Sequence, residues 1–144
     1  MPASLSYVWN IPHFSSLSCL SMYSPAFPIR AHMWKIYVYP NGNNNSGRQI
    51  SIYLDSGITD NNDLPCTFKL AVVNYKKGLA PTEPSVDASI NWRETIVKES
   101  DHVFTKRAKD WGFREFMPLE KLRDPQAGFL NDDAITVGVL LELA

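Results

Sequence analysis

The stretch Lys109-Asp110-Trp111-Gly112-Phe113-Arg114-Glu115-Phe116-Met117-Pro118-Leu119 decides how this chain folds. It has too many apolar residues for a surface loop, and their spacing does not repeat every three or four residues as in an amphipathic helix. A glycine in a helix interior would also cost about 1 kcal/mol. The stretch therefore predicts a short strand that bends at Gly112, because glycine marks bulges and close backbone approaches. A bent edge strand that displays an aromatic residue is suited to receive a peptide.

Short runs of alternating bulky residues occur in the rest of the chain. In residues 33–39, for example, Trp34, Ile36 and Val38 lie on one face of an extended strand. The asparagine-rich segment at 40–47 predicts a turn, and residues 118–122 predict one helical turn. Strands are predicted at residues 7–11, 26–30, 33–39, 50–55, 67–74 and 135–143, and Ile90, Trp92 and Ile96 predict an extra strand or a flap. The pattern predicts an all-β, antiparallel β-sandwich.

Length and composition place limits on the function. The 144 residues predict one domain, and the formal net charge of −1 argues against nucleic acid or an anionic membrane as the partner. No run approaches the roughly 20 apolar residues of a membrane span, and the N-terminal residues lack the pattern of a secretory signal. Cys19 and Cys66 predict free thiols in a reducing compartment. We therefore expect an intracellular protein, in the cytoplasm or the nucleus.

The sequence shows no pattern of catalytic or cofactor-binding residues. The two cysteines and three histidines have no local motif that would pair a nucleophile with a base, and no Cys-x-x-Cys or His-x-x-x-His spacing for zinc occurs. Asp132 and Asp133 are adjacent, so a turn is expected there instead of a shared carboxylate site. A glycine-rich phosphate loop is also absent from the sequence. We predict no enzyme activity, no metal and no cofactor for this chain.

An ordered set of motifs resembles the MATH domain, also called the TRAF-like or TRAF C-terminal domain, from about residue 7 to residue 143. The motifs are Trp9 with Ile11 and Phe14, Ser24-Pro25-Ala26-Phe27, Trp34-Lys35-Ile36, Tyr39-Pro40-Asn41-Gly42-Asn43, Ser51-Ile52-Tyr53-Leu54, Asp110-Trp111-Gly112-Phe113, Phe116-Met117-Pro118-Leu119, and Asp124-Pro125 through Gly128-Phe129-Leu130. Within the family the likeness is greatest to the N-terminal MATH domain of the herpesvirus-associated ubiquitin-specific protease and its plant and fungal relatives. His102-Val103-Phe104 belongs to the motifs that carry this likeness.

The resemblance implies an eight-stranded TRAF-like sandwich that binds short extended peptides of partner proteins in a shallow groove. It implies that Asp110, Trp111 and Gly112 form the strand against which the peptide pairs. Trp111 would pack on an apolar peptide residue, and Asp110 would accept hydrogen bonds from a serine or the backbone of an Ala/Pro-x-x-Ser-like motif. The other implied groove residues are Arg30, Tyr53, Phe68, Asp101 and Phe113.

Simpler interpretations exist for several of these residues. Trp111 and Phe113 are core residues in the alternative interpretation, Asp110 is a turn carboxylate and Arg30 is an exposed charge. Alternation also places Phe68 on the core face of its strand, and the segment at 76–99 is longer than is usual in the family.

Three functions agree with the resemblance. The first is a deubiquitinase targeting domain, the second the MATH domain of a BTB-type ubiquitin-ligase adaptor, and the third a structural or oligomerisation domain as in TRAF trimers. No coiled-coil heptads precede the domain in this sequence, so we expect a monomer in isolation.

Overall fold

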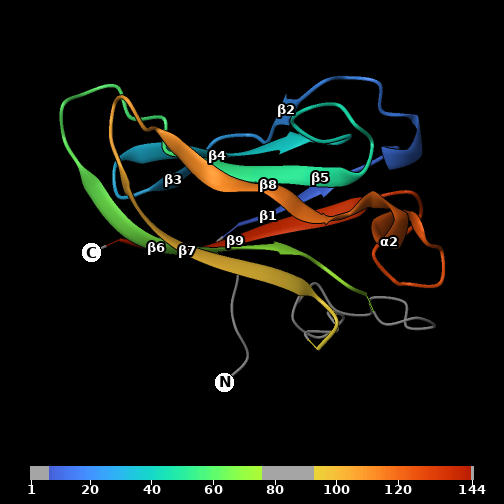
Figure 1. Ribbon diagram of the computed structural model, residues 1–144. Coiled ribbons are helices and arrows are strands. Elements are labelled where there is room, and N and C mark those ends of the chain that lie inside the picture. Colours follow the sequence, from blue (N-terminus) through green and yellow to red (C-terminus); the bar gives the residue numbers. More distant parts are fainter. Residues whose placement is uncertain (1–6, 76–92, 144) are drawn as a thin grey trace.

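Two antiparallel sheets pack face to face in the computed structural model, which describes residues 7–75 and 93–143 (Figure 1). One sheet holds, in spatial order, β1 (Tyr7–Ile11), β9 (Ile135–Leu143), β6 (Leu64–Val72) and β7 (Ile96–Phe104). The other holds β2 (Met22–Tyr23), β4 (His32–Tyr39), β5 (Gln49–Asp55) and β8 (Asp110–Pro118), and β3 (Phe27–Ile29) pairs with the start of β4. The predicted all-β antiparallel sandwich is confirmed.

Helices contribute little to the described residues. They are the 3-10 helix η1 (Phe14–Ser16) and the α-helix α2 (Leu119–Arg123), which lies where one helical turn was expected. Among the described residues, no helix has the length and apolar character needed to cross a membrane.

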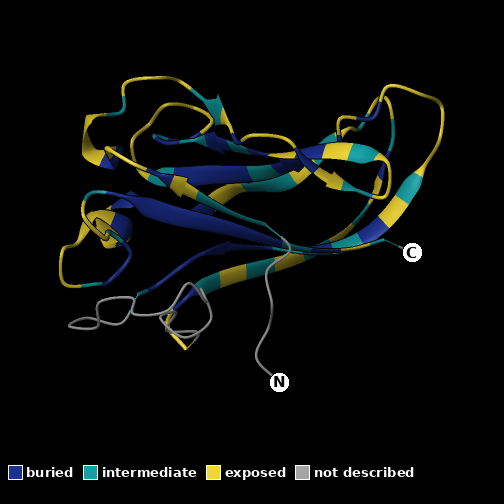
Figure 2. Cartoon of the chain, turned by 180° about the vertical axis from the view of Figure 1, so that it is seen from behind, coloured by how far each residue is buried: buried dark blue, intermediate teal, exposed yellow. Residues whose placement is uncertain are grey.

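The core lies between the two sheets and follows the alternation of the strands (Figure 2). Each fully buried aliphatic or aromatic side chain stabilises the fold by about 1.5–3 kcal/mol relative to exposure. Alternate residues of the central strands are buried: Trp34, Ile36 and Val38 in β4, Ile50, Ile52 and Leu54 in β5, Phe68, Leu70 and Val72 in β6, and Ile135, Val137, Val139 and Leu141 in β9. Trp9 is partly buried and packs against this core.

The strand β7 is the main difference from the sequence-based prediction. Its nine residues form one continuous strand, whereas the sequence suggested a separate strand or flap ending near Ile96. Ile96 opens β7, and Ile90 and Trp92 lie outside the described residues. The centre of β7 is polar, with exposed residues alternating with half-buried ones, and the strand pairs only with β6 among the described residues. Polar edge strands carry a weak hydrophobic pattern, and for that reason the strand was missed.

The edges of β7 and β8 lie side by side along one side of the sandwich (Figure 1). Within the described residues, β7 pairs only with β6 and β8 pairs only with β5. The loop at 105–109 carries the chain from one sheet to the other, and in it the Thr105 N–H donates to the Ala108 carbonyl at 3.2 Å. Two unpaired strand edges therefore face the same side of the molecule.

Candidate functional site

Trp111 is the most exposed aromatic side chain along this side, with 47% of its surface accessible. Its indole N–H donates a hydrogen bond to the Ser100 hydroxyl at 3.2 Å. Its ring stacks on the His102 imidazole, with 4.4 Å between centroids and 6° between planes. The His102 Nε2–H in turn donates to the Ala108 carbonyl at 3.1 Å, which orients the imidazole. Trp111 is therefore held in place by β7 and still presents a large apolar surface.

Phe113 is a second aromatic residue on the same face of β8 as Trp111, two residues farther along the strand; we call the two residues the aromatic rim. It is half-buried, and its ring meets that of Phe116 edge-on at 5.9 Å. The Lys98 ammonium lies 5.9 Å from the Phe113 ring centre and donates to the Glu115 carbonyl at 2.9 Å. Lys98 thus ties β7 to β8, and Trp111 and Phe113 line the boundary between the two strands.

Gly112 lies on the other face of β8, opposite Tyr53 of β5. A Cβ on Gly112 would meet the Ile52 carbonyl oxygen and lie 2.5 Å from the Tyr53 Cα, so the predicted close backbone approach is confirmed. The bend expected at Gly112 lies elsewhere, because the strand register shifts between Ile52 and Ile50, beyond Phe113. Without a side chain at Gly112, the ring of Tyr53 is left uncovered from the β8 side.

Tyr53 belongs to a group of four tyrosines on the outer face of this sheet, which we call the tyrosine platform. Its members are Tyr23, Tyr37, Tyr39 and Tyr53. Tyr23 and Tyr37 stack at 4.1 Å, and the Tyr53 hydroxyl accepts a hydrogen bond from the Asn43 amide at 2.9 Å. A hydrogen bond with Tyr37 is the main cause that raises the pKa of Tyr39 to about 12. Tyr39 is therefore neutral at physiological pH.

Asp110 lies at the start of β8, directly opposite Asp55 of β5. Asp55 is buried and accepts a hydrogen bond from the Gly57 N–H at 2.9 Å. Partial burial, and then the charge of Asp55, raise the pKa of the Asp110 carboxyl above its ordinary value, against a smaller opposing effect of Lys109 and His102. No described residue donates a hydrogen bond to the Asp110 carboxylate. Asp110 can therefore accept hydrogen bonds from a ligand.

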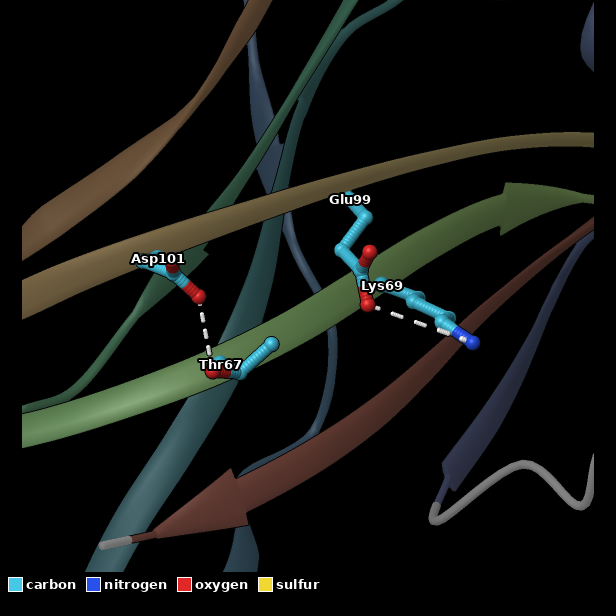
Figure 3. A network of polar contacts seen from close by, with 4 residues as sticks. All are labelled: Thr67, Lys69, Glu99 and Asp101. Carbon is cyan, nitrogen blue, oxygen red and sulfur yellow. Dashed lines mark hydrogen bonds and ion pairs between the residues drawn. The ribbon is translucent and has the colours of Figure 1, made fainter.

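The structure does not bring Asp101 and Phe68 to this site. Asp101 accepts a hydrogen bond from Thr67 at 2.7 Å on the outer face of β6 and β7, beside the ion pair of Lys69 and Glu99 (Figure 3). Alternation along β7 places Asp101 on the face opposite to Ser100 and His102. The small polar residue that meets Trp111 is therefore Ser100, one position earlier than the resemblance implied.

Phe68 is 1% exposed and packs in the core, as the alternation of its strand indicates, so it offers no surface to a ligand. Arg30 is exposed and lies in the turn between β3 and β4, with φ 49°. The strands β4 and β5 separate this turn from β8 in the sheet. Of the eight predicted site residues, five lie along β8 or directly beside it: Tyr53, Asp110, Trp111, Gly112 and Phe113.

Three residues that touch the site were not predicted: Lys98, Ser100 and His102. They are alternate residues of β7, and all three contact side chains or backbone of β8 or of the loop before it. Their spacing of two was the signal that could have found them, provided that β7 had been recognised as one strand.

Both cysteines are free thiols, as expected, and Cys66 of β6 lies directly opposite His102 of β7. Burial raises the pKa of the Cys66 thiol to about 11, so this thiol stays protonated and is a poor nucleophile. Within residues 7–75 and 93–143, no three side chains of the metal-ligating types lie together.

A model of the MATH domain family matches residues 6–141 of the chain. Ubiquitin C-terminal hydrolase 12 of Arabidopsis thaliana is 37% identical over 142 residues, which cover 94% of this chain and 11% of the hydrolase. Ubiquitin carboxyl-terminal hydrolase 15 of Saccharomyces cerevisiae is 28% identical over 142 residues, with 92% and 11% covered. The chain therefore spans about a tenth of the length of these hydrolases.

Among solved structures, TRAF5 of Notothenia coriiceps is similar, with a TM-score of 0.57 and 18% identity. The superposition covers 95% of this chain and 72% of that one. At this identity the likeness shows the fold alone.

Proposed function

Because the chain belongs to the MATH domain family, we propose that it binds a short extended segment of partner proteins along the free edge of β8. A MATH domain is a protein-interaction module and not a catalytic one, so recognition of a partner is the activity to be explained. The observation that carries the proposal is Trp111, whose ring is held by Ser100 and His102 and is still half exposed.

The backbone of β8 supplies the first element of recognition. Its edge away from β5 has no strand partner among the described residues, so an extended segment that lies along it gains main-chain hydrogen bonds. Side chains of such a segment alternate between two sides. One side meets the rim of Trp111 and Phe113, and the other meets Gly112 and Tyr53 on the outer face.

The side chains of β8 supply specificity. Trp111 is fixed before binding, which lowers the entropy lost on association, and tryptophan is frequent among the dominant contacts of interfaces. Asp110 accepts a hydrogen bond from a serine or a backbone amide of the segment, since no described residue donates to it. The partner motif is of the Ala/Pro-x-x-Ser type, bound with micromolar affinity, near ~−8 kcal/mol.

The partners so bound are substrates recruited for the ubiquitin pathway, in the cytoplasm or nucleus. The likeness to ubiquitin hydrolases of a plant and a yeast supports this part of the proposal. The domain acts as a monomer in isolation. Light scattering tests this, and a trimer whose mass does not change with concentration would contradict it.

A peptide array with a fixed Ala/Pro-x-x-Ser core and degenerate flanks tests the proposed function. We expect the domain to select a subset of the array, and Trp111→Ala to weaken binding of the selected peptides at least tenfold by fluorescence polarisation. Leu20→Ala is the matched control, because Leu20 is also an exposed apolar residue but lies far from β8 in the sequence and outside its sheet partners. Unchanged affinity in a folded Trp111→Ala variant would contradict the proposal.

A further inference from the structure

A polar cavity of about 610 Å³ opens beside the far end of the exposed β8 segment. It is lined by Arg48 and Gln49 where β5 begins, by Asn44 and Ser46 of the preceding turn, and by Arg114 and Glu115 of β8. Two arginines and one glutamate line the cavity, so its lining carries a net positive formal charge.

The backbone around this cavity is fixed by hydrogen bonds. The Ser51 hydroxyl accepts from the Asn43 N–H at 2.9 Å and donates to the Arg114 carbonyl, which joins the turn to β8 at the register shift. Within the turn, the Gly42 N–H donates to the Tyr39 carbonyl at 3.0 Å, and the Arg48 N–H donates to the Ser46 hydroxyl at 3.3 Å. Arg48 and Arg114 are thus presented from two elements that are tied together.

Neither guanidinium is neutralised within the part of the chain that the structure describes. The ion pair between Lys69 and Glu99 on the other sheet is the only one there, and no described side chain accepts a hydrogen bond from either arginine head group. A planar guanidinium binds carboxylate and phosphate groups with paired hydrogen bonds. Two of them at one cavity favour an anion.

The cavity lies at the end of the outer face of β8, the face that carries Gly112 and along which the docked segment would lie. Asp110 and Gly112 are alternate residues of β8 and point to the same side, and the turn that lines the cavity reaches that side because the Asn43 amide donates to the Tyr53 hydroxyl at 2.9 Å. A strand that pairs with this edge places its own alternate residues beside them, about two residues apart. The charged side chains therefore change sign along β8. Asp110 and Asp55 lie at one end, Gly112 and Tyr53 carry no formal charge in the middle, and Arg114 and Arg48 lie at the other end.

We propose that the cavity of Arg48 and Arg114 binds an anionic side chain of the docked segment, about two residues from the one beside Gly112. The anion is a glutamate, an aspartate or a phosphorylated residue. In a segment antiparallel to β8 it lies on the N-terminal side of the residue beside Gly112. This inference rests on the proposed function and adds a charge requirement to the motif.

The peptide array provides the first test. Among the selected peptides, we expect one flanking position to favour Glu or phosphoserine over Gln about threefold to tenfold, and less at high salt. Arg114→Gln should abolish this preference, and Arg114→Glu should reverse it in favour of Lys or Arg. Arg107→Glu is the matched control, because it makes the same charge change at the opposite end of β8, in the loop at 105–109.

The outcomes separate the two proposals. Trp111-dependent binding with no anionic preference, or with a preference that Arg114→Glu leaves unchanged, would overturn the inference and leave the proposed function standing. Comparison of the glutamate and phosphoserine peptides shows which anion is preferred, and either preference supports the inference.

A second measurement tests the cavity without a peptide. Sodium phosphate and N-acetylglutamate amide are titrated into the labelled domain at constant ionic strength, and the Arg side-chain Nε–H signals are followed by NMR. We expect shifts concentrated at Arg48 and Arg114 and lost in Arg114→Gln. Such shifts without any peptide binding would support an anion site while contradicting the proposed function. Shifts no larger than those caused by sodium chloride would overturn the inference.

Discussion

Two tryptophans, Trp34 and Trp111, show how the position of a strand decides what a side chain does. Both lie in strands, both donate a hydrogen bond through the indole N–H, and both contact another aromatic ring. Trp34 is 0% exposed because it packs between the two sheets against Phe104, whereas Trp111, on the edge strand β8, is 47% exposed although Ser100 and His102 contact it. The same residue type therefore stabilises the core in one region and is available to a partner in the other.

Trp34→Ala should have the largest effect on stability. It removes a fully buried ring that meets Phe104 edge-on at 5.2 Å, and leaves a cavity between the sheets. We expect the free energy of unfolding to fall by about 3–5 kcal/mol in urea denaturation. Trp9→Ala is the comparison, because Trp9 is only partly buried at the edge of the core. A loss at Trp34 no greater than that at Trp9 would contradict the contrast between core and edge.

Gly112→Ala should have the next largest effect, and it tests how tightly the exposed region is attached to the core. The new Cβ would collide with backbone atoms of Ile52 and Tyr53, which cannot rotate away as a side chain can. We expect a loss of about 1–3 kcal/mol, together with weaker peptide binding because β8 must move away from β5. Gly47→Ala is the comparison: nothing lies within 4 Å of its Cβ position, so a loss there comes from its φ of 75° alone. An unchanged free energy of unfolding in Gly112→Ala would show that the close approach does not matter.

The same contrast explains which parts of the fold could be predicted from the sequence. The strands β4 and β5 alternate between buried aliphatic and outer polar or aromatic residues, so their period of two was clear. The polar edge strand β7 gave no such signal, because its less exposed alternate residues at the centre are Lys98, Ser100 and His102, which are polar. The sandwich was therefore predictable, and the strand that completes the site was not.

The candidate site was predictable only where its residues lie on β8 or beside it. Asp110, Trp111, Gly112 and Phe113 are consecutive, so one motif found them together. Ser100 and His102 reach Trp111 from the other sheet, and that contact depends on how the loop at 105–109 brings two edges side by side. The resemblance implied Asp101 as a groove residue, but neighbouring residues of a strand lie on opposite faces, so Ser100 contacts Trp111 and Asp101 contacts Thr67.

A double-mutant cycle tests whether the stack on His102 holds Trp111 in place, with a smaller expected effect than the two substitutions above. The cycle compares the free energies of unfolding of Trp111→Ala, His102→Ala and the double variant. We expect a coupling energy of about 0.5–1.5 kcal/mol between the two stacked rings. Peptide binding should also weaken in His102→Ala, since Trp111 loses the ring that orients it. His32→Ala is the control, because His32 lies in β4 away from this stack. Additive effects of the two substitutions would show that the stack does not position Trp111.

Asp110→Asn should have the smallest effect on stability, and of the opposite sign. Burial and Asp55 raise the pKa of the Asp110 carboxyl, so ionisation of this group destabilises the folded state. That cost is present above the raised pKa and absent below the ordinary value of 3.8. The neutral asparagine should therefore stabilise the domain at pH 7, and the gain over the wild type should disappear as the pH falls below 3.8.

Urea denaturation of both proteins at matched pH values measures this difference, and a gain that persists at low pH would contradict its electrostatic origin. Peptide affinity should change in the other direction, because asparagine replaces an ionised acceptor by a weaker neutral one.

At Trp34 substitution can only lower stability, since every contact of that ring is already made within the fold. At Asp110 the carboxylate weakens the fold and has no donor among the described residues. A group that is retained at a cost to stability is expected where a partner supplies the missing hydrogen bond. We therefore expect the partner to bind at β8 and not at the core strands.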